Sequence, residues 1–404
     1  LKLSDFDNRY HYSSSKKLFF RVKYSKSSGG SFLKIIHFSD THLGFNDLDI
    51  LSNENINQRE ADFYDAFSQV VEQIKAIRPD YIIHTGDLFH RASPSNRAIT
   101  FALEQFKVID ELGIPFILIA GNHSTPRTNL SSPILKIFEG FKNIHVSFEQ
   151  KYKKMEFENI IFHTLPHMND ETKALSQIEL CEENIHKDKT NVMMMHCSVG
   201  ASYLMSEFGE WVYPSEKEYI FKMMDYVALG HWHGFSRVGK HENVYYSGST
   251  ERTSLGDKRN SKGFALVTLD EALHVEYKEI NIRPMVQKEI ECEEFENSVS
   301  KLDTSDTKDA LVEVKLTNLT AMQSIDIQNR DIKQLFADAL HVSVKREFKK
   351  GANEESINDV EALSLEEFFL EHVKEASQEK EYERLKQKIQ ELFAIYEESA
   401  NDTL

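Results

Sequence analysis

The sequence predicts an α/β fold of four layers, arranged as an α/β/β/α sandwich. Short apolar segments alternate with amphipathic segments over roughly the first third of the chain, an order typical of a parallel sheet covered by helices. Further short apolar segments follow up to residue 285, and they are numerous enough to form a second sheet. We therefore expect one layered domain at residues 33–285.

The first three strands and the two helices between them are the clearest elements. Leu33–Phe38, Tyr81–His84 and Pro115–Ala120 are short and apolar, as buried strands are. Ala61–Arg78 and Asn96–Leu112 carry apolar residues at helical spacing, and a proline or a glycine follows each. Shorter strands are predicted at Ile144–Val146, Asn159–His163, Asn191–His196, Tyr226–Leu229 and Asn243–Tyr246, and a closing hairpin at Gly263–Thr268 and Leu273–Ile282.

The pattern changes after Pro284. Ala310–Leu316 alternates between apolar and polar residues as an edge strand does, and Asp331–His341 has the pattern of a helix. We expect a small α+β cap domain at residues 286–350. Residues 351–404 are expected to form a linker and a helical tail, because an apolar stripe recurs there at steps of three and four residues.

Composition limits the compartment and the partners. Of the net charge of −17, residues 352–404 carry −10 and the other 351 residues carry −7, so the acidity does not exclude nucleic acid as a partner. Three cysteines without a CxxC pair, and no apolar run of membrane-spanning length, indicate a reduced, cytoplasmic protein without a membrane partner. Residues 1–31, rich in serine, lysine and tyrosine, are expected to be an extension or linker.

Residues of metal-binding types follow five of the predicted strands. The carboxyl ends of strands in a layered α/β sheet form one ligand-binding edge, so these residues are expected to converge. An Asp and a His at positions i and i+2 of an extended segment also point to the same side. The converging residues are Asp40 and His42, Asp87, Asn122 and His123, His196, and His231 and His233.

These side chains suit a pair of divalent cations. Two cations about 3.5–4 Å apart can neutralise a phosphoryl group and lower the pKa of a shared water. Asp87, the lone aspartate at a central strand end, is the carboxylate best suited to bridge them. Mixed carboxylate, amide and imidazole ligands favour Mn²⁺, with Fe²⁺ or Mg²⁺ as alternatives. Each motif is common alone, but the ordered set predicts a two-metal phosphoesterase.

The ordered motifs resemble those of the calcineurin-like metallophosphoesterases. More narrowly, SDTHLGF at Ser39–Phe45, GDLFHRASPS at Gly86–Ser95 and YSGSTERTSLGD at Tyr246–Asp257 resemble the SbcD-type nuclease subunits of DNA double-strand-break repair. The resemblance covers residues 33–285, and it implies a Mn²⁺-dependent DNA exonuclease and endonuclease. Two rival functions stay open: a phosphatase or small cyclic-nucleotide phosphodiesterase, and a non-catalytic scaffold on the same fold.

The resemblance also assigns roles to individual residues. It implies that His123 is the catalytic histidine at the leaving 3′ oxygen, and that His90 orients the phosphate. Ser124 departs from the family, which usually has an acidic residue after GNH that could orient the His123 ring. The implied ligands are Asp40, His42, Asp87 and His233 for the first metal, and Asp87, Asn122, His196 and His231 for the second.

Four basic residues and two kinds of partner complete the predictions. Arg252 is expected either to meet the phosphate backbone of DNA or to pair with a local carboxylate. Lys258, Arg259 and Lys262 form a basic cluster that is a candidate for DNA contact, or else an ordinary charged loop. The resemblance implies that the tail binds an SbcC-type, SMC-like ATPase and that the first two helices form a homodimer. A tail that packs on its own chain is the alternative to the ATPase partner.

Overall fold

The computed structural model describes residues 22–23, 33–125, 132–204, 210–257, 260–349, 386 and 388 of the chain. It divides into two compact units, Leu1–Met285 and Val286–Leu404. The predicted tail at 351–404 lies outside the described residues, apart from residues 386 and 388. Among the helices that are described, none is both long and apolar enough to cross a membrane.

The first unit contains two sheets. The seven-stranded sheet has a parallel part, β2 to β5, in which each strand pairs with the next. The hairpin of β12 and β13 pairs antiparallel with β2, which confirms the predicted closing hairpin. In order across the sheet the strands are β1 (Val22–Lys23), β13 (Ala272–Glu279), β12 (Gly263–Leu269), β2 (Leu33–Phe38), β3 (Tyr81–His84), β4 (Phe116–Ile119) and β5 (Ile144–Ser147).

The six-stranded sheet is parallel in its centre and antiparallel at its edges. Strands β7, β8, β9 and β11 run in the same direction, and β6 and β10 flank them in the opposite one. In order across the sheet the strands are β10 (Ser236–Arg237), β11 (Val244–Tyr246), β9 (Tyr226–Gly230), β8 (Thr190–His196), β7 (Ile160–Leu165) and β6 (Lys153–Glu156).

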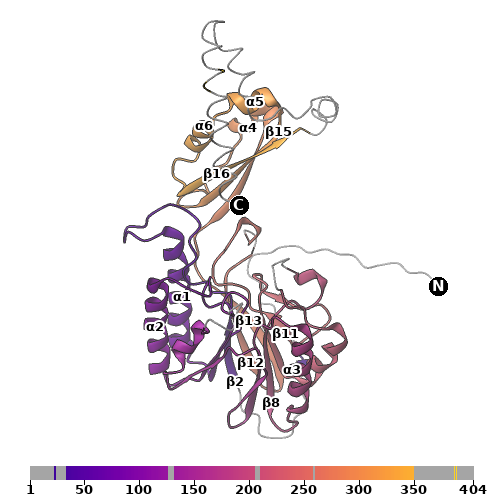
Figure 1. Cartoon of the computed structure of the whole chain (residues 1–404). Coiled ribbons are helices and arrows are strands. Elements are labelled where there is room, and N and C mark those ends of the chain that lie inside the picture. The colour runs from indigo at the N-terminus through magenta and orange to yellow at the C-terminus, as the bar shows by residue number, and fades with distance from the viewer. Residues whose placement is uncertain are drawn as a thin grey trace, which may run out of the picture. The chain divides into compact units, whose positions relative to one another are not determined.

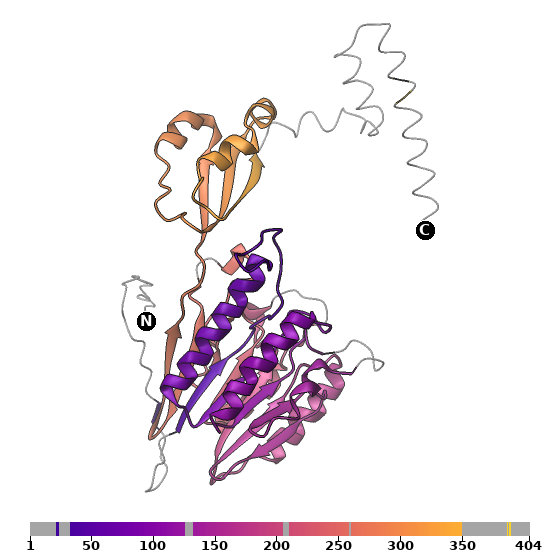
Figure 2. The same cartoon turned by 90° about the vertical axis from the view of Figure 1, so that its left-hand side faces the viewer.

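Helices cover the outer face of each sheet (Figure 1). Helices α1 (Gln58–Ile77) and α2 (Asn96–Glu111) lie side by side over the first sheet, as the view turned by 90° in Figure 2 shows. Helix α3 (Glu171–Glu183) and the 3-10 helix η3 (Ser215–Met223) cover the second sheet. Short 3-10 helices occupy the loops: η1 (Ile134–Phe138), η2 (Ala201–Tyr203) and η4 (Leu255–Asp257).

Side chains alternate along β2 and thereby build two of the cores. Ile36 packs with α1 and α2, whereas Ile35 faces the second sheet and packs with Val192 and Ala228. This alternation follows from the two-residue period of a strand. A third core lies between the second sheet and α3, so the predicted α/β/β/α order is confirmed.

The predicted boundaries of the helices needed small corrections. Helix α1 begins at Gln58 rather than at residue 61, because the Asn57 side chain accepts hydrogen bonds from the main-chain N–H groups of Arg59 and Glu60 and starts the helix earlier. It ends at Ile77 rather than at residue 78, because Arg78 adopts a left-handed conformation before the proline. Helix α3 was not predicted from the sequence.

The second unit contains a three-stranded sheet with short helices. Its strands are β14 (Met285–Glu291), β15 (Leu311–Leu319) and β16 (His341–Phe348), and its helices are η5 (Cys292–Glu294), α4 (Phe295–Ser300), α5 (Ala321–Asp326) and α6 (Asn329–Gln334). Strand β15 is the central strand, so its prediction as an edge strand was wrong. The helix predicted at Asp331–His341 was wrong at its end, because His341 already pairs with Leu311 as the first residue of β16.

Candidate metal centre

The predicted metal-binding residues follow the carboxyl ends of β2, β3, β4, β8 and β9. The loops after β2 and β3 are held together by main-chain hydrogen bonds. Asp40 N–H donates to the Gly86 carbonyl over 3.0 Å, and His42 N–H donates to the Asp87 carbonyl over 3.0 Å. These main-chain contacts fix the loop after β2 in register with the loop after β3.

The side chains of these loops converge on Asp87. Its Oδ2 lies 3.1 Å from His196 Nε2, and the same nitrogen lies 2.9 Å from Asn122 Oδ1. On the other side, His42 Nε2 lies 3.3 Å from His233 Nε2. Among the described residues, three groups of three donors have their atoms within 4.8 Å of one another, close enough to hold an ion: Asp40, His42 and His233; Asp40, Asp87 and His196; and His42, His90 and His123.

The buried carboxylates of this cluster need a compensating positive charge. Asp40 and Asp87 are almost fully buried, and a buried carboxylate is costly without a compensating charge. Burial by itself would raise the pKa of Asp87, but the charge and hydrogen bond of His196 outweigh it and hold that pKa well below its usual range. Burial opposes protonation of His196 also, yet Asp87 raises the His196 pKa to about 9. Positive charge beside Asp87 therefore stabilises this cluster, and a divalent cation would supply such charge, so the residues present fit a metal.

Two glycines permit the close packing beneath the cluster. A Cβ on Gly86 would lie 2.2 Å from His196 Nδ1, and a Cβ on Gly121 would lie 2.2 Å from Asp87 Oδ1. Gly86 also has a φ of +108°, which L side chains rarely adopt. Gly86 of the GD pair and Gly121 of the GN pair therefore each make room for a predicted ligand from another loop.

Four of the seven predicted ligands have left-handed backbone conformations. The φ angles are 51° at Asp40, 42° at His42, 54° at Asp87 and 97° at His231. Such conformations are uncommon for residues other than glycine and cluster at functional sites. They also correct the expectation that Asp40 and His42 converge through an extended segment, because β2 ends at Phe38 and the chain turns sharply after it.

The ring nitrogens that point away from the cluster are held by hydrogen bonds. His196 Nδ1–H donates to the Thr85 carbonyl over 2.8 Å, which leaves Nε2 to face Asp87 and Asn122. His233 Nδ1–H donates to Thr253 Oγ1 over 3.1 Å, and the Thr253 hydroxyl donates to Asp257. Outer partners of this kind fix the tautomer and orientation of metal-binding histidines.

His123 stands beside the cluster with a hydrogen-bond arrangement of its own. Its main-chain N–H donates to Asp87 Oδ1 over 2.9 Å, and its Nδ1–H donates to the His90 carbonyl over 2.7 Å. The His123 ring lies 4.9 Å from the His42 ring and 5.3 Å from the His90 ring. An acidic residue in place of Ser124 could have oriented the His123 ring. Here the His90 carbonyl accepts from Nδ1–H instead, and this hydrogen bond defines the tautomer of His123.

The four candidate DNA-binding residues have different surroundings. Lys262 is buried, with Nζ donating to the His233 carbonyl and to Ser249 Oγ, so it does not lie on the surface where DNA contact requires it. The Arg252 guanidinium donates to the main-chain carbonyls of Asp257, Asn260 and Arg283, and its contact with a DNA phosphate stays a prediction. Residues Lys258 and Arg259 lie outside the described residues.

A buried ion-pair network explains another part of the motifs. Arg59, almost fully buried, lies 2.8 Å from Asp62 and 3.7 Å from Glu251. Arg283 pairs with the same Asp62 at 2.8 Å. The network ties the start of α1 to the ERTS segment, which in turn carries Thr253 behind His233.

Sequence reasoning missed several residues that support the site. Thr253 and Asp257 were within a quoted motif, so their spacing could have suggested a role behind His233. Glu210, whose Oε1 lies 3.1 Å from His231 Nε2, belongs to no motif and gave no signal. His167 has its ring 6.4 Å from that of His196, and burial lowers its pKa to about 4.

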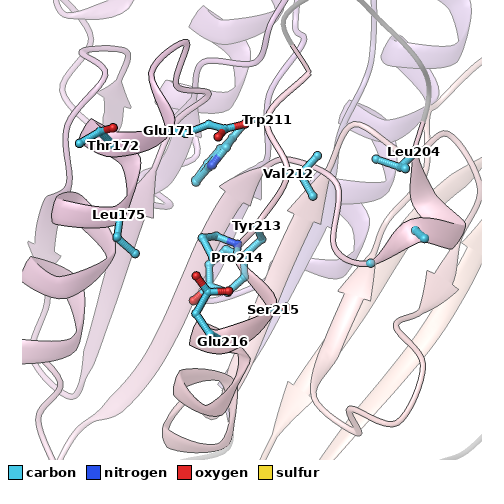
Figure 3. Close-up of a pocket in the computed structure, with 12 residues that line it drawn as sticks. Glu171, Thr172, Leu175, Leu204, Trp211, Val212, Tyr213, Pro214, Ser215 and Glu216 are labelled. Atoms are coloured by element: carbon cyan, nitrogen blue, oxygen red, sulfur yellow. The ribbon is translucent and has the colours of Figure 1, made fainter.

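A separate cavity of about 610 Å³ lies on the α3 side of the second sheet. Figure 3 shows Glu171, Thr172 and Leu175 of α3 on one side of it and Trp211 to Glu216 on the other. None of the predicted ligands lines this cavity. The candidate metal centre is therefore defined by its donors, and this cavity is not part of it.

The comparison with known families agrees with this donor set. Residues 33–235 match the family model of the calcineurin-like phosphoesterases, which is half of the chain. The chain belongs to this family of metallophosphoesterases, as its motifs predict.

More particular similarity is found to repair proteins. The chain is 28% identical over 288 residues to the DNA double-strand break repair protein Mre11 of Thermoplasma acidophilum, covering 68% of this chain and 73% of the relative. It is 25% identical over 358 residues to the Mre11 of Methanococcus maripaludis, covering 85% and 91%. These similarities confirm the resemblance to the repair nuclease type.

Solved structures with the same kind of domain are also similar. One is a dimetal phosphatase from Danio rerio, 12% identical, with 61% of this chain and 99% of that chain covered and a TM-score of 0.39. Another is the calcineurin-like phosphoesterase YfkN from Bacillus subtilis, 12% identical, with 68% and 97% covered and a TM-score of 0.40.

Proposed function

We propose that this chain is a divalent-metal-dependent nuclease that hydrolyses DNA phosphodiester bonds during double-strand-break repair. The observation that carries the proposal is the convergence of six carboxylate, amide and imidazole donors, Asp40, His42, Asp87, Asn122, His196 and His233. His231 is joined to them by its main-chain hydrogen bond to Asp40, and His123 by its main-chain hydrogen bond to Asp87. The choice of DNA as substrate is supported by the two archaeal relatives, whose names describe double-strand break repair proteins.

The resident metals in this proposal are two Mn²⁺ ions. When bound, they supply positive charge for the phosphoryl oxygens and acidify a water between them. Oxygen and imidazole donors without a thiolate favour Mn²⁺ or Fe²⁺. The residues proposed to hold them are Asp40, His42, Asp87 and His233 for one ion, and Asp87, Asn122, His196 and His231 for the other.

His123 is proposed to protonate the leaving 3′ oxygen. Because the His90 carbonyl accepts from Nδ1–H, Nε2 is the ring nitrogen that can pass a proton to substrate. The hydrogen bond from His123 N–H to Asp87 Oδ1 keeps this ring at a fixed distance from the bridging carboxylate. The His90 ring stacks 5.3 Å from that of His123 and is proposed to orient the phosphate.

The remaining domains and partners are proposals from the resemblance. Residues 286–350 would form a cap that contacts DNA, and 351–404 a tail that binds an SMC-like ATPase. A homodimer through α1 and α2 would use side chains other than their large aromatic residues. Phe67 and Phe106 are buried in the core, and Tyr64 stacks on Phe101 at 4.2 Å within the chain.

Two substrates separate the proposed nuclease from a phosphatase. Purified protein with Mn²⁺ is expected to degrade single-stranded DNA and to turn over para-nitrophenyl phosphate poorly, and chelation with EDTA should stop both reactions. Turnover of the small ester alone would identify a phosphatase. If calorimetry at micromolar Mn²⁺ detected no binding, the chain would be a scaffold. Asp87→Asn is the control, because it removes the shared charge and should abolish binding of the metal pair.

Co-purification tests the proposed tail. Deletion of residues 363–404 is expected to leave Mn²⁺-dependent DNA cleavage unchanged and to abolish co-purification with a co-expressed SMC-like ATPase. Unchanged co-purification of the shortened chain would refute the docking role.

A further inference from the structure

Glu210 lies against the second nitrogen of a proposed metal ligand. Its Oε1 is 3.1 Å from His231 Nε2, and the same oxygen accepts a hydrogen bond from the Ser198 hydroxyl. We propose that Glu210 and Ser198 form a positioning pair that holds the His231 ring for the second metal. This inference rests on the proposed two-metal function.

The arrangement repeats one found on the other side of the site. His233 has its Nδ1 bonded to the Thr253 hydroxyl at 3.1 Å, and Asp257 lies behind both at 3.3–3.4 Å. A hydroxyl and a carboxylate therefore stand behind each histidine of the GHWH segment. The two pairs come from separate parts of the chain, so the repetition does not follow from proximity in sequence.

The chemistry of the ring decides which nitrogen meets the metal. Glu210 is a carboxylate that can only accept, so His231 carries its hydrogen on Nε2 and its lone pair on Nδ1. His196 and His233 have the opposite arrangement, with Nδ1 held and Nε2 facing the cluster. Without Glu210 the His231 ring could adopt the other tautomer, which places a hydrogen where the metal needs a lone pair.

Burial supports the same role for Glu210. Its side chain is only 8% exposed, and a buried carboxylate needs donors to offset its loss of water. The Ser198 hydroxyl and His231 Nε2–H are such donors.

Main-chain contacts fix the place of Glu210. After β8, Ser198 N–H donates to the Trp211 carbonyl over 2.9 Å, and Tyr213 N–H donates to the Ser198 carbonyl over 2.8 Å. Glu210 immediately precedes this paired segment. The other end of the contact is equally fixed, because His231 N–H donates to Asp40 Oδ2 over 3.0 Å. The His231 residue is thus held by Asp40 at its backbone and by Glu210 at its ring.

Metal binding by matched variants tests the proposal. Calorimetry should give two Mn²⁺ ions per wild-type chain, and electron paramagnetic resonance should show the signal of a coupled Mn²⁺ pair. Glu210→Ala should weaken one of the two sites by about 10–100-fold, the usual effect of losing an outer partner, and should lose the coupled signal. Glu216→Ala removes an exposed carboxylate that lines the separate cavity, and it should bind as the wild type does.

Conservative variants distinguish positioning from other roles. Glu210→Gln keeps an oxygen that accepts from His231 Nε2–H, so it should restore most of the affinity that Glu210→Ala loses. Ser198→Ala should weaken Mn²⁺ binding less than Glu210→Ala does. If Glu210→Ala fails to fold, Glu210→Gln and Ser198→Ala still test the pair.

Three outcomes are decisive. The pair is refuted if folded Glu210→Ala binds both ions as tightly as the wild type. It is also refuted if the glutamine variant is as weak as the alanine variant, since Glu210 would then act through its charge as a ligand. If the wild type itself binds no Mn²⁺ pair, the proposed function fails instead.

Discussion

Substitution of Gly121 is expected to damage the metal centre directly. A Cβ at this position would lie 2.2 Å from Asp87 Oδ1 and 2.7 Å from Asp87 N, whereas real Cβ contacts stay above 3.0 Å. The Asp87 carboxylate would have to move by about 0.8 Å, the difference between 3.0 and 2.2 Å. Oδ1 is also the acceptor for His123 N–H, so the movement would disturb both the carboxylate proposed to be shared by the two ions and the histidine proposed as catalytic.

The expected size of the effect follows from the burial of the site. Overpacking of a buried position costs about 1–3 kcal/mol of unfolding free energy. A displacement near 1 Å in an active site lowers the rate about 10²-fold. Urea unfolding with EDTA measures the first effect, and DNA cleavage with Mn²⁺ measures the second.

Gly140 provides the matched control. It lies in an exposed turn, and a Cβ there would meet nothing within 4 Å. Gly140→Ala should therefore change stability by less than about 0.5 kcal/mol and leave cleavage unchanged. If Gly121→Ala behaved like Gly140→Ala in both assays, the argument that the glycine makes room for Asp87 would be wrong.

Three further predictions concern titration, packing and catalysis. Burial lowers the pKa of His37 from 6.5 to about 3, so between these pH values only the unfolded chain binds the proton. The free energy of unfolding, measured with EDTA, should therefore fall by about 1.4 kcal/mol for each unit of pH below 6.5. His37→Gln should reduce this slope. Arg59→Ala leaves Asp62 and Glu251 without a buried partner and should cost about 3–5 kcal/mol in urea unfolding. His123→Gln should lower kcat by about 10²–10⁴-fold and keep two Mn²⁺ ions in calorimetry.

Each of these has its own control or contradiction. An unchanged slope in His37→Gln would show that other groups cause the acid sensitivity. Arg97→Ala is the control for Arg59→Ala: it removes a half-exposed arginine that pairs with Glu60, so it should lower the free energy of unfolding by at most about 1 kcal/mol. If Arg59→Ala lost no more than this, the role of Arg59 in the buried network would be contradicted. Loss of both metals in His123→Gln would show that His123 is a ligand.

The sequence predicted the layered fold because the strongest signals are local. Strands β2 and β3 were placed at their observed bounds, since each is a short apolar run that ends abruptly in polar motif residues. Helix α3 gave no such signal. It buries only Ala174, Ile178 and Cys181, and most of its other residues are polar, so no apolar stripe stood out.

The predicted site residues came from motifs. Of the residues that were missed, Thr253 and Asp257 lie within a quoted motif but contact the outer nitrogen of His233, and Glu210 lies outside every motif. Glu210 meets His231 across 21 positions of sequence, and only the fold brings the two together. Lys262 was read as a surface charge because its neighbours are basic. In the structure its ammonium group is buried among Ser249, Asp257 and the His233 carbonyl, and burial lowers its pKa to about 8. Local composition does not reveal such burial.

The left-handed conformations of Asp40, His42, Asp87 and His231 have a consequence for how metal would enter. Each such conformation costs on the order of 1–3 kcal/mol, and main-chain hydrogen bonds between the loops, such as the one from Asp40 N–H to the Gly86 carbonyl, help to hold it. We therefore expect a cation to meet donors whose positions the main chain already fixes. Loading should be limited by dehydration of the ion and not by rearrangement of the chain, so a metal-stripped protein should regain its ions without refolding.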